Sequence, residues 1–226
     1  MLVKEKIVFT GADIVTLSEK VPHAQAVCVS NGRIDCVGSE SEILRYAKMG
    51  ACQVIQLQEG TLYPGFIDTH SHLSMYGDCL DQVYCGSELG SITAIQEKIS
   101  QKALTTPEGR WIIGYGYDDS AIQDNRHMGK QDLDIISTKH PILISHISNH
   151  MGYVNTLGLN LLNFSSKTKI PGGKIVLDGH GEPTGFILEN ALISAFGKLP
   201  PLTEEKIKEN ITRAIADYNK NGITTF

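Results

Sequence analysis

The chain has 226 residues and a formal net charge of −5, so it lacks the basic surplus that is typical of nucleic-acid-binding proteins. No stretch approaches the ~18 uninterrupted apolar residues of a membrane helix, and the first residues contain no apolar signal-peptide core. Five cysteines without a CxxC pair fit reduced thiols better than a disulfide framework. We therefore expect a cytoplasmic protein with no nucleic-acid and no membrane partner.

Residues 1–62 form the first predicted domain, which is rich in β-strands. Asn31-Gly32 separates two strand-like runs, and both residues tolerate the positive φ of a tight turn, so a β-hairpin is predicted over 25–38. Ser39 and the acidic residues after it predict the start of a short helix, which Gly50 ends. Three further strands are predicted over 7–10, 13–17 and 53–57, the first two flanking Gly11.

Residues 63–226 form the second predicted domain, in which strands and helices alternate. An amphipathic helix is predicted over 91–104, because Ile92, Ile95 and Ile99 recur at helical spacing. The remaining predictions are buried strands over 66–67 and 141–146, further strands over 111–118, 171–178, 182–189 and 223–226, and helices over 131–137, 156–163 and 203–219, the last burying Ile207, Ile211, Ile215 and Tyr218.

The run from Pro64 to His72 is the most informative one in the chain. Phe66 and Ile67 predict a short strand that ends in a polar cluster containing Asp68, His70 and His72. Residues i and i+2 of a strand point to the same face, so the two imidazoles would project together and could bind one transition-metal ion. A solvated His-x-His pair on a surface loop is the simpler alternative for the pattern alone.

The run from Pro64 to His72 resembles the signature that opens the first barrel strand of the metal-dependent amidohydrolase superfamily, in particular the branch that includes N-substituted formamide deformylases. Further matches follow in family order. They are the glycine-aromatic-Asp loop 114–118, the segment from His150 to Asn155, and the hairpin from Gly172 to Glu189. Several motifs in one order are more specific than His-x-His alone.

The resemblance implies an α/β fold: a partial (β/α) TIM-like barrel, an amino-terminal small β-sandwich and an inserted α+β region. It implies a hydrolase that acts on C–N bonds of non-peptide amides, with N-acyl or N-formyl amides as small-molecule substrates. The metal ligands would be His70 and His72, and the divalent metal would be zinc, with iron or manganese as alternatives. Asp68 would shape the end of the strand.

The resemblance also implies substrate contacts for His150, Tyr117, Asp118 and Asn155. Each has a structural alternative; Asn155, for instance, could cap the helix that starts at Thr156. Glu189 could approach the metal or a helix terminus. His146 is expected to be structural or to support residues that contact the ligand, and the remaining histidines, His23, His127, His140 and His180, are expected to be solvated.

A complete (β/α)₈ barrel needs about 200–250 residues, more than the second domain contains. We therefore expect a missing carboxyl-terminal portion that would supply the later metal ligands and the general base, and a chain that is inactive by itself. The alternative is a non-catalytic relative that acts by association with itself or a partner. Exposed strand edges would favour a homo-oligomer in either case.

Overall fold

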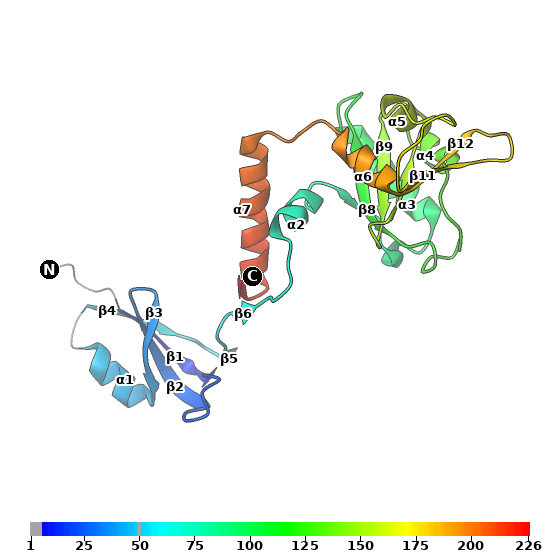
Figure 1. Cartoon of the computed structure of the whole chain (residues 1–226). Helices are drawn as coiled ribbons and strands as arrows, with labels where there is room; N and C mark the ends of the chain where they lie inside the picture. The colour runs from blue at the N-terminus through cyan, green and yellow to red at the C-terminus, as the bar shows by residue number, and fades with distance from the viewer. Residues whose placement is uncertain (1–5, 49–50) are drawn as a thin grey trace. The chain divides into compact units, whose positions relative to one another are not determined.

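The computed structural model describes residues 6–48 and 51–226, and its chain divides into two compact units (Figure 1). The first unit consists of residues 1–71 and 218–226, and the second consists of residues 72–217. The chain therefore passes between the units at two points, between Ser71 and His72 and between Asp217 and Tyr218. No helix in the described part of the chain is long and apolar enough to cross a bilayer.

The first unit contains a five-stranded sheet in the order β3-β2-β1-β4, with β5 beside β1. The two strands predicted on either side of Gly11 are one strand, β1, with an irregularity between Thr10 and Ile14. Gly11 has a φ of +87°, and a Cβ there would lie 2.3 Å from the carbonyl oxygen of Leu57, so the chain bends at Gly11 without ending the strand. The strands are β1 (Lys6–Val15), β2 (His23–Ser30), β3 (Arg33–Gly38), β4 (Cys52–Gln56) and β5 (Thr61–Leu62).

The predicted hairpin is confirmed, because β2 and β3 pair in antiparallel fashion around Asn31 and Gly32, whose φ values are +53° and +72°. Helix α1 (Glu40–Ala47) begins after the N-cap Ser39, whose backbone N–H donates to the Glu42 carboxylate. Gly50, the predicted end of this helix, lies outside the described residues. Over the described residues of the predicted domain 1–62, the expected sandwich is a single sheet, with α1 packed through Ile43 and Ala47 against Val8 and Cys28.

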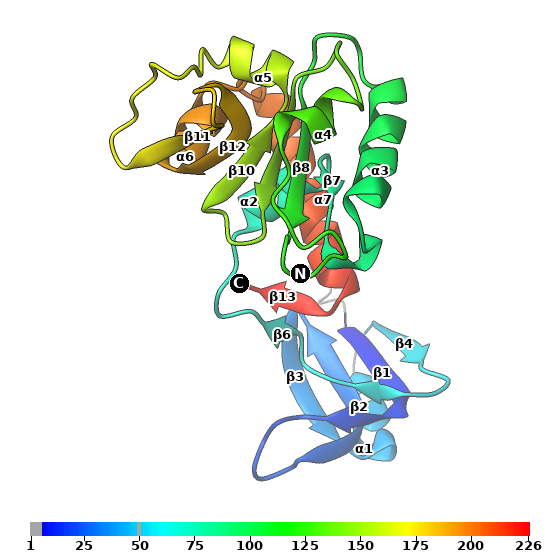
Figure 2. The ribbon, with the colours of Figure 1, turned by 90° about the vertical axis from the view of Figure 1, so that its right-hand side faces the viewer.

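Strand β6 (Phe66–Ile67) pairs in parallel with β13 (Ile223–Thr225), also in the first unit, and Figure 2 shows the two strands side by side. The prediction that β6 is buried is wrong: Phe66 is 57% exposed and Ile67 is 69% exposed. The reason is that β13 is the only partner of β6 among the described residues. The strands in residues 6–48 and 51–226 form no closed barrel.

The second unit is built on a six-stranded mixed sheet in the order β11-β12-β10-β9-β8-β7. Strands β7, β8 and β9 are parallel, and β10, β12 and β11 continue the sheet in antiparallel pairs. The strands are β7 (Val83–Tyr84), β8 (Ile112–Tyr117), β9 (Ile142–His146), β10 (Met151–Val154), β11 (Gly173–Leu177) and β12 (Pro183–Glu189).

Both faces of this sheet are covered, which explains the continuous apolar run in β9. Ile142 and Ile144 pack on one face with Ile95 of α3, while Leu143 packs on the other face with Leu192 of α6. Figure 2 shows α3 running along the sheet beside β8. The helices of this unit are α2 (Leu73–Cys79), η1 (Ser87–Leu89), α3 (Ile92–Thr105), α4 (Lys130–Asp134), α5 (Thr156–Leu161), α6 (Asn190–Gly197) and most of α7 (Glu204–Lys220), whose last three residues belong to the first unit.

Helix α7 buries a different face from the one its apolar spacing predicts. Ile207 and Ile215 are 42% and 41% exposed, whereas Asn210 and Ala214 are buried. The buried face makes polar contacts with the segment that contains α2: the Asn210 amide donates to Asp78, and Arg213 donates to Asp81. The amphipathic pattern therefore predicted the helix but assigned its buried face incorrectly.

Candidate functional site

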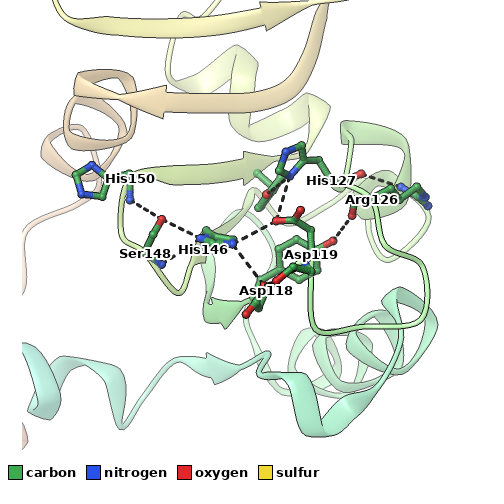
Figure 3. Close-up of polar contacts among 10 residues, drawn as sticks. Asp118, Asp119, Arg126, His127, His146, Ser148 and His150 are labelled. Atoms are coloured by element: carbon green, nitrogen blue, oxygen red, sulfur yellow. Dashed lines mark hydrogen bonds and ion pairs between the residues drawn. The ribbon is translucent and has the colours of Figure 1, made fainter.

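A polar cluster lies where two parallel strands of the second unit end. Tyr117 ends β8 and His146 ends β9, and these two residues are register partners. Asp118 and Asp119 follow Tyr117 directly in the chain. The carboxyl ends of parallel strands are common ligand-binding positions, and here they bring two carboxylates to one imidazole (Figure 3).

Asp119 is the centre of this cluster. Its Oδ1 lies 3.2 Å from Nε2 of His146 and 3.3 Å from Nδ1 of His127. Oδ1 of Asp118 lies 4.0 Å from the same Nε2. His127 Nδ1 is also 2.9 Å from the hydroxyl of buried Tyr153. The Asp119 carboxylate therefore faces two imidazoles. His146 is fixed by its place at the end of β9, and His127 by its contact with Tyr153 of β10.

The protonation of His146 follows from its hydrogen bonds. The backbone N–H of Ser148 donates to Nδ1 of His146 over 3.0 Å, so Nδ1 accepts and carries no proton. In the neutral ring the proton is then on Nε2, the nitrogen that faces Asp119. Only 10% of the His146 side chain is exposed, so this arrangement is largely shielded from water.

Three further sets of contacts hold the loop that carries the carboxylates. Asp118 accepts hydrogen bonds from the hydroxyl and backbone N–H of Ser120, which lower the pKa of Asp118. Arg126 forms a bidentate pair with Asp132, with both N–O distances 2.8 Å, and this pairing lowers the pKa of Asp132. The hydroxyl of Tyr117 donates to the Arg126 carbonyl over 2.6 Å.

A cavity of about 510 Å³ opens beside His146 in the second unit. Its size suits a small-molecule ligand. The walls are largely apolar and include Tyr84, Tyr115, Leu192 and Phe196. Burial raises the pKa of Tyr115, so its hydroxyl stays protonated and can donate a hydrogen bond.

A second histidine–carboxylate pair lies at the other end of the same turn. Nδ1 of His150 is 2.8 Å from Oε2 of Glu189, and the two side chains are 67% and 57% exposed. The backbone N–H of His150 contacts the Ser148 hydroxyl, which also contacts His146. Figure 3 shows His150, Ser148 and His146 in sequence along this turn.

The predicted metal ligands His70 and His72 lie outside a regular strand, because β6 ends at Ile67. Both are exposed, His70 in the first unit and His72 in the second. Asp68 accepts from the backbone N–H of His70 over 3.1 Å, and its own N–H donates to Thr225. Because His70 and His72 are not in a strand, strand geometry does not bring their side chains to one face. Metal binding by these residues remains a prediction.

Two of the residues predicted to contact substrate are fully buried. Tyr117 belongs to the core between α3 and the sheet. The Asn155 side chain accepts from the N–H groups of Ile142 and Gly158, and donates to the His140 carbonyl. Asn155 thus caps α5 and ties it to β9, while substrate contacts by either residue remain predictions.

The sequence analysis missed Asp119 and wrongly expected His140 to be solvated, whereas His127 is exposed as expected. His127 stacks on Phe186, with ring centroids 4.3 Å apart, and contacts Tyr153. His140 is 6% exposed and lies 3.0 Å from the Thr106 carbonyl. The doublet Asp118-Asp119 after an apolar strand was the available signal for the cluster, but its imidazole partners come from distant segments.

Asp118, Asp119 and His146 are the one group of three metal-binding side chains among the described residues, with ligand atoms within 4.8 Å of one another. The group does not fit a metal as arranged, because metal binding at Nε2 needs a free lone pair and a donor at Nδ1, the reverse of what Ser148 imposes. Neutral imidazoles suit zinc or iron. If His70 and His72 bind the metal as predicted, they would supply two of the three protein ligands that catalytic zinc usually takes.

The family model for the amidohydrolase family matches residues 53–226. The sequence is 30% identical to YtcJ of Bacillus subtilis, named as an amidohydrolase, over 97% of this chain and 41% of that protein. It is 34% identical to the N-substituted formamide deformylase of Arthrobacter pascens, over 82% of this chain and 34% of that protein. The chain belongs to the amidohydrolase family.

Solved structures agree on the fold. An uncharacterized metal-dependent hydrolase from Pyrococcus furiosus matches 97% of this chain with a TM-score of 0.68 and 23% identity. A second, from Pyrococcus horikoshii, matches with a TM-score of 0.70 and 22% identity. The chain spans 43% and 42% of these two structures, and thus about two fifths of the length of its relatives.

Proposed function

We propose that the protein is a metal-dependent hydrolase that cleaves C–N bonds of non-peptide amides, with N-formyl and N-acyl amides as substrates. Membership of the amidohydrolase family over residues 53–226 is the observation that carries this proposal. The 34% identity to a protein named N-substituted formamide deformylase favours formamides within that class.

His70 and His72 would hold the divalent metal, with zinc as the first candidate and iron or manganese as alternatives. A bound divalent metal lowers the pKa of its water to near 7 and polarises a carbonyl. The cavity beside His146 would bind an organic substituent of the substrate, and Asp118 and His150 stay predicted substrate contacts. Because two histidines are fewer ligands than catalytic zinc usually takes, we expect little turnover by this chain alone.

Metal content of the purified chain tests this proposal. We expect wild type to carry zinc, iron or manganese, and the His70→Ala/His72→Ala variant to lose it. The matched control is His23→Ala/His180→Ala, which removes two exposed histidines elsewhere and should keep the metal. Equal metal in all three proteins, or loss of metal only when Asp118 and Asp119 are replaced, would contradict the assignment.

A non-catalytic chain that acts by self-association is the second candidate. The exposed apolar residues Phe66, Ile67, Ile207 and Ile215 favour it. Light scattering of the same preparations separates the two. A metal-free oligomer supports association alone, whereas metal that is bound by wild type and lost in His70→Ala/His72→Ala supports the enzyme.

A further inference from the structure

Three of the five cysteines lie together in the first unit, on the side of its sheet that α1 covers. Cys28 is fully buried there, and Cys36 and Cys52 are partly buried against the same apolar cluster. No group of three metal-binding side chains in residues 6–48 and 51–226 includes a cysteine. The three thiols are therefore not arranged as ligands of one metal ion.

Cys28 and Cys36 are register partners on the neighbouring antiparallel strands β2 and β3, which Figure 2 shows side by side. Their side chains are in contact, since a hydrogen bond joins the two thiols. Directly opposite residues of an antiparallel pair have Cβ atoms about 4.5–5.5 Å apart, and a disulfide needs about 3.5–4.5 Å. A small approach of the two strands is therefore enough to bring the sulfur atoms to bonding distance.

Strand β3 is placed to make this approach. It is an edge strand of the sheet, so β2 is its one neighbour there. The register shifts next to Cys28, and Asp35 is an extra residue of β3 without a partner in β2. The Asp35 carboxylate instead accepts from the hydroxyl of Tyr46 on α1 over 2.8 Å. An edge strand with an unpaired residue beside Cys36 can shift without disturbing a second neighbour.

Cys52 cannot replace either member of this pair. It lies on β4, which β1 separates from β2. Its register partner in β1 is Lys6, whereas the partner of Cys28 in β1 is Val8. Neighbouring strands are about 4.8 Å apart, so two strand spacings exceed the roughly 7 Å beyond which two Cα atoms cannot be bridged. The sheet therefore selects Cys28 and Cys36 for bond formation.

We propose that Cys28 and Cys36 are an oxidation site, at which a peroxide forms a reversible cross-strand disulfide that fixes the β2–β3 hairpin. The thiolate of Cys36, the more exposed of the two, attacks an oxygen of hydrogen peroxide. The O–O bond breaks, and Cys36 becomes a sulfenic acid while water is released. The Cys28 sulfur then attacks the Cys36 sulfur, the S–O bond breaks, and the hydroxyl leaves as water with the Cys28 proton. Two thiols and one hydrogen peroxide thus give one disulfide and two waters, and a dithiol reductant restores the thiols.

The surroundings of the pair determine how its reactivity depends on pH. Its charged and titratable neighbours are Asp35, Lys6, Tyr46 and Cys52, from β3, β1, α1 and β4. Burial is the largest influence and raises the pKa of both thiols; Asp35 raises it further, and Lys6 lowers it. Little thiolate is present at pH 7, so the rate of disulfide formation should rise close to tenfold between pH 7 and pH 8.

Peptide mapping of the oxidised wild-type chain tests the proposal directly. Trypsin cuts after Arg33, so Cys28 lies in peptide 21–33 and Cys36 in peptide 34–45. After treatment with hydrogen peroxide at pH 8 and blocking of the free thiols, we expect these two peptides to be linked, and to separate in dithiothreitol. A link from either peptide to the one that contains Cys52, a covalent dimer, or sulfonic acid at Cys36 beside a free Cys28 would overturn the proposal.

Variants of the same cluster show that the two thiols react directly with each other. Cys52→Ser is the matched control, because it removes the third thiol under α1 and should leave the link between peptides 21–33 and 34–45 in place. Cys36→Ser should abolish the link and leave Cys28 as a free thiol. Loss of the link in Cys52→Ser would contradict direct reaction between Cys28 and Cys36.

Hydrogen exchange tests whether the disulfide fixes the hairpin. A bond that closes residues 28–36 restricts the opened hairpin, so the amides of β2 and β3 should exchange at least about tenfold more slowly in the oxidised chain than in the reduced one. The amides of α3, in the second unit, are the internal control and should not change. Equal or faster exchange of β2 and β3 in the oxidised chain would overturn this effect of the disulfide.

Discussion

The backbone N–H of Ser148 lies 3.0 Å from Nδ1 of His146 and donates a hydrogen bond to it. This contact orients the imidazole so that Nε2–H faces Asp119, 3.2 Å away. The end of β9 is thereby joined to the loop that follows β8. The contact between His146 and Asp119 therefore stabilises the folded chain whether or not a ligand is bound.

Asp119→Ala should destabilise the second unit by about 1–3 kcal/mol, because it leaves the His146 N–H without its acceptor at a mostly buried site. Urea unfolding followed by fluorescence measures the loss. Asp118→Ala is the matched control: its carboxylate is bonded to its chain neighbours Ser120 and Ala121 and lies farther from His146, so its loss should cost less than about 1 kcal/mol. An equal decrease in the free energy of unfolding for the two variants would contradict the conclusion that Asp119 is the main partner of His146.

Asn155→Ala should be among the most damaging single changes. It removes the cap of α5 and leaves the backbone N–H of Ile142 unpaired in the core. We expect a loss of about 3 kcal/mol in the free energy of unfolding. Asn160→Ala on the exposed side of the same helix should change the unfolding free energy by no more than about 0.5 kcal/mol.

Ionised Asp132 stabilises the second unit, and this contribution is lost at acidic pH. The hydrogen bonds from Arg126 lower the pKa of Asp132 in the folded chain, so the carboxylate contributes stability above its ordinary pKa of about 3.9. That contribution is lost as the pH falls through the lowered value. Asp132→Asn should therefore be less stable than wild type at pH 7, with a difference that narrows toward pH 3 in urea titrations.

Cys85 should resist thiol reagents in the native protein. It is fully buried, and burial raises its pKa to about 12, so little thiolate is present at pH 8. Cys28 is also fully buried. A disulfide reagent should label the other three cysteines, Cys36, Cys52 and Cys79, before these two, and all five at once in denaturant. Rapid labelling of Cys85 under native conditions would contradict the buried assignment.

Local patterns in the sequence were sufficient for the elements that local chemistry determines. The Asn31-Gly32 turn adopts the expected positive φ values, and Ser91 caps α3 by accepting from Ala94. The continuous apolar run over 141–146 predicted a buried strand, which is β9. Each of these features depends on residues within a few positions of one another, so a single sequence can indicate them.

Long-range pairing accounts for what the sequence analysis missed. Asp119 meets His146 because β8 and β9 are parallel neighbours, and His127 arrives through a separate loop. The buried face of α7 was misassigned because Asn210 and Arg213 find carboxylate partners near α2, which no helical period can show. The His150–Glu189 pair likewise depends on the register of β10 and β12.

The pairing of β6 with β13 also bears on how the chain folds. Phe66 is the register partner of Ile223, so the second unit is an excursion between two adjacent strands. Each doubling of a loop's length raises the free energy of closing it by only about 0.6 kcal/mol. The rate of closure is affected more, because contacts between residues far apart in the sequence form slowly. We expect the parallel pair of β8 and β9 to form first. Its formation shortens the disordered segment that must close before β13 pairs with β6. Truncations or insertions within the excursion should then alter the speed of this last step more than its final equilibrium.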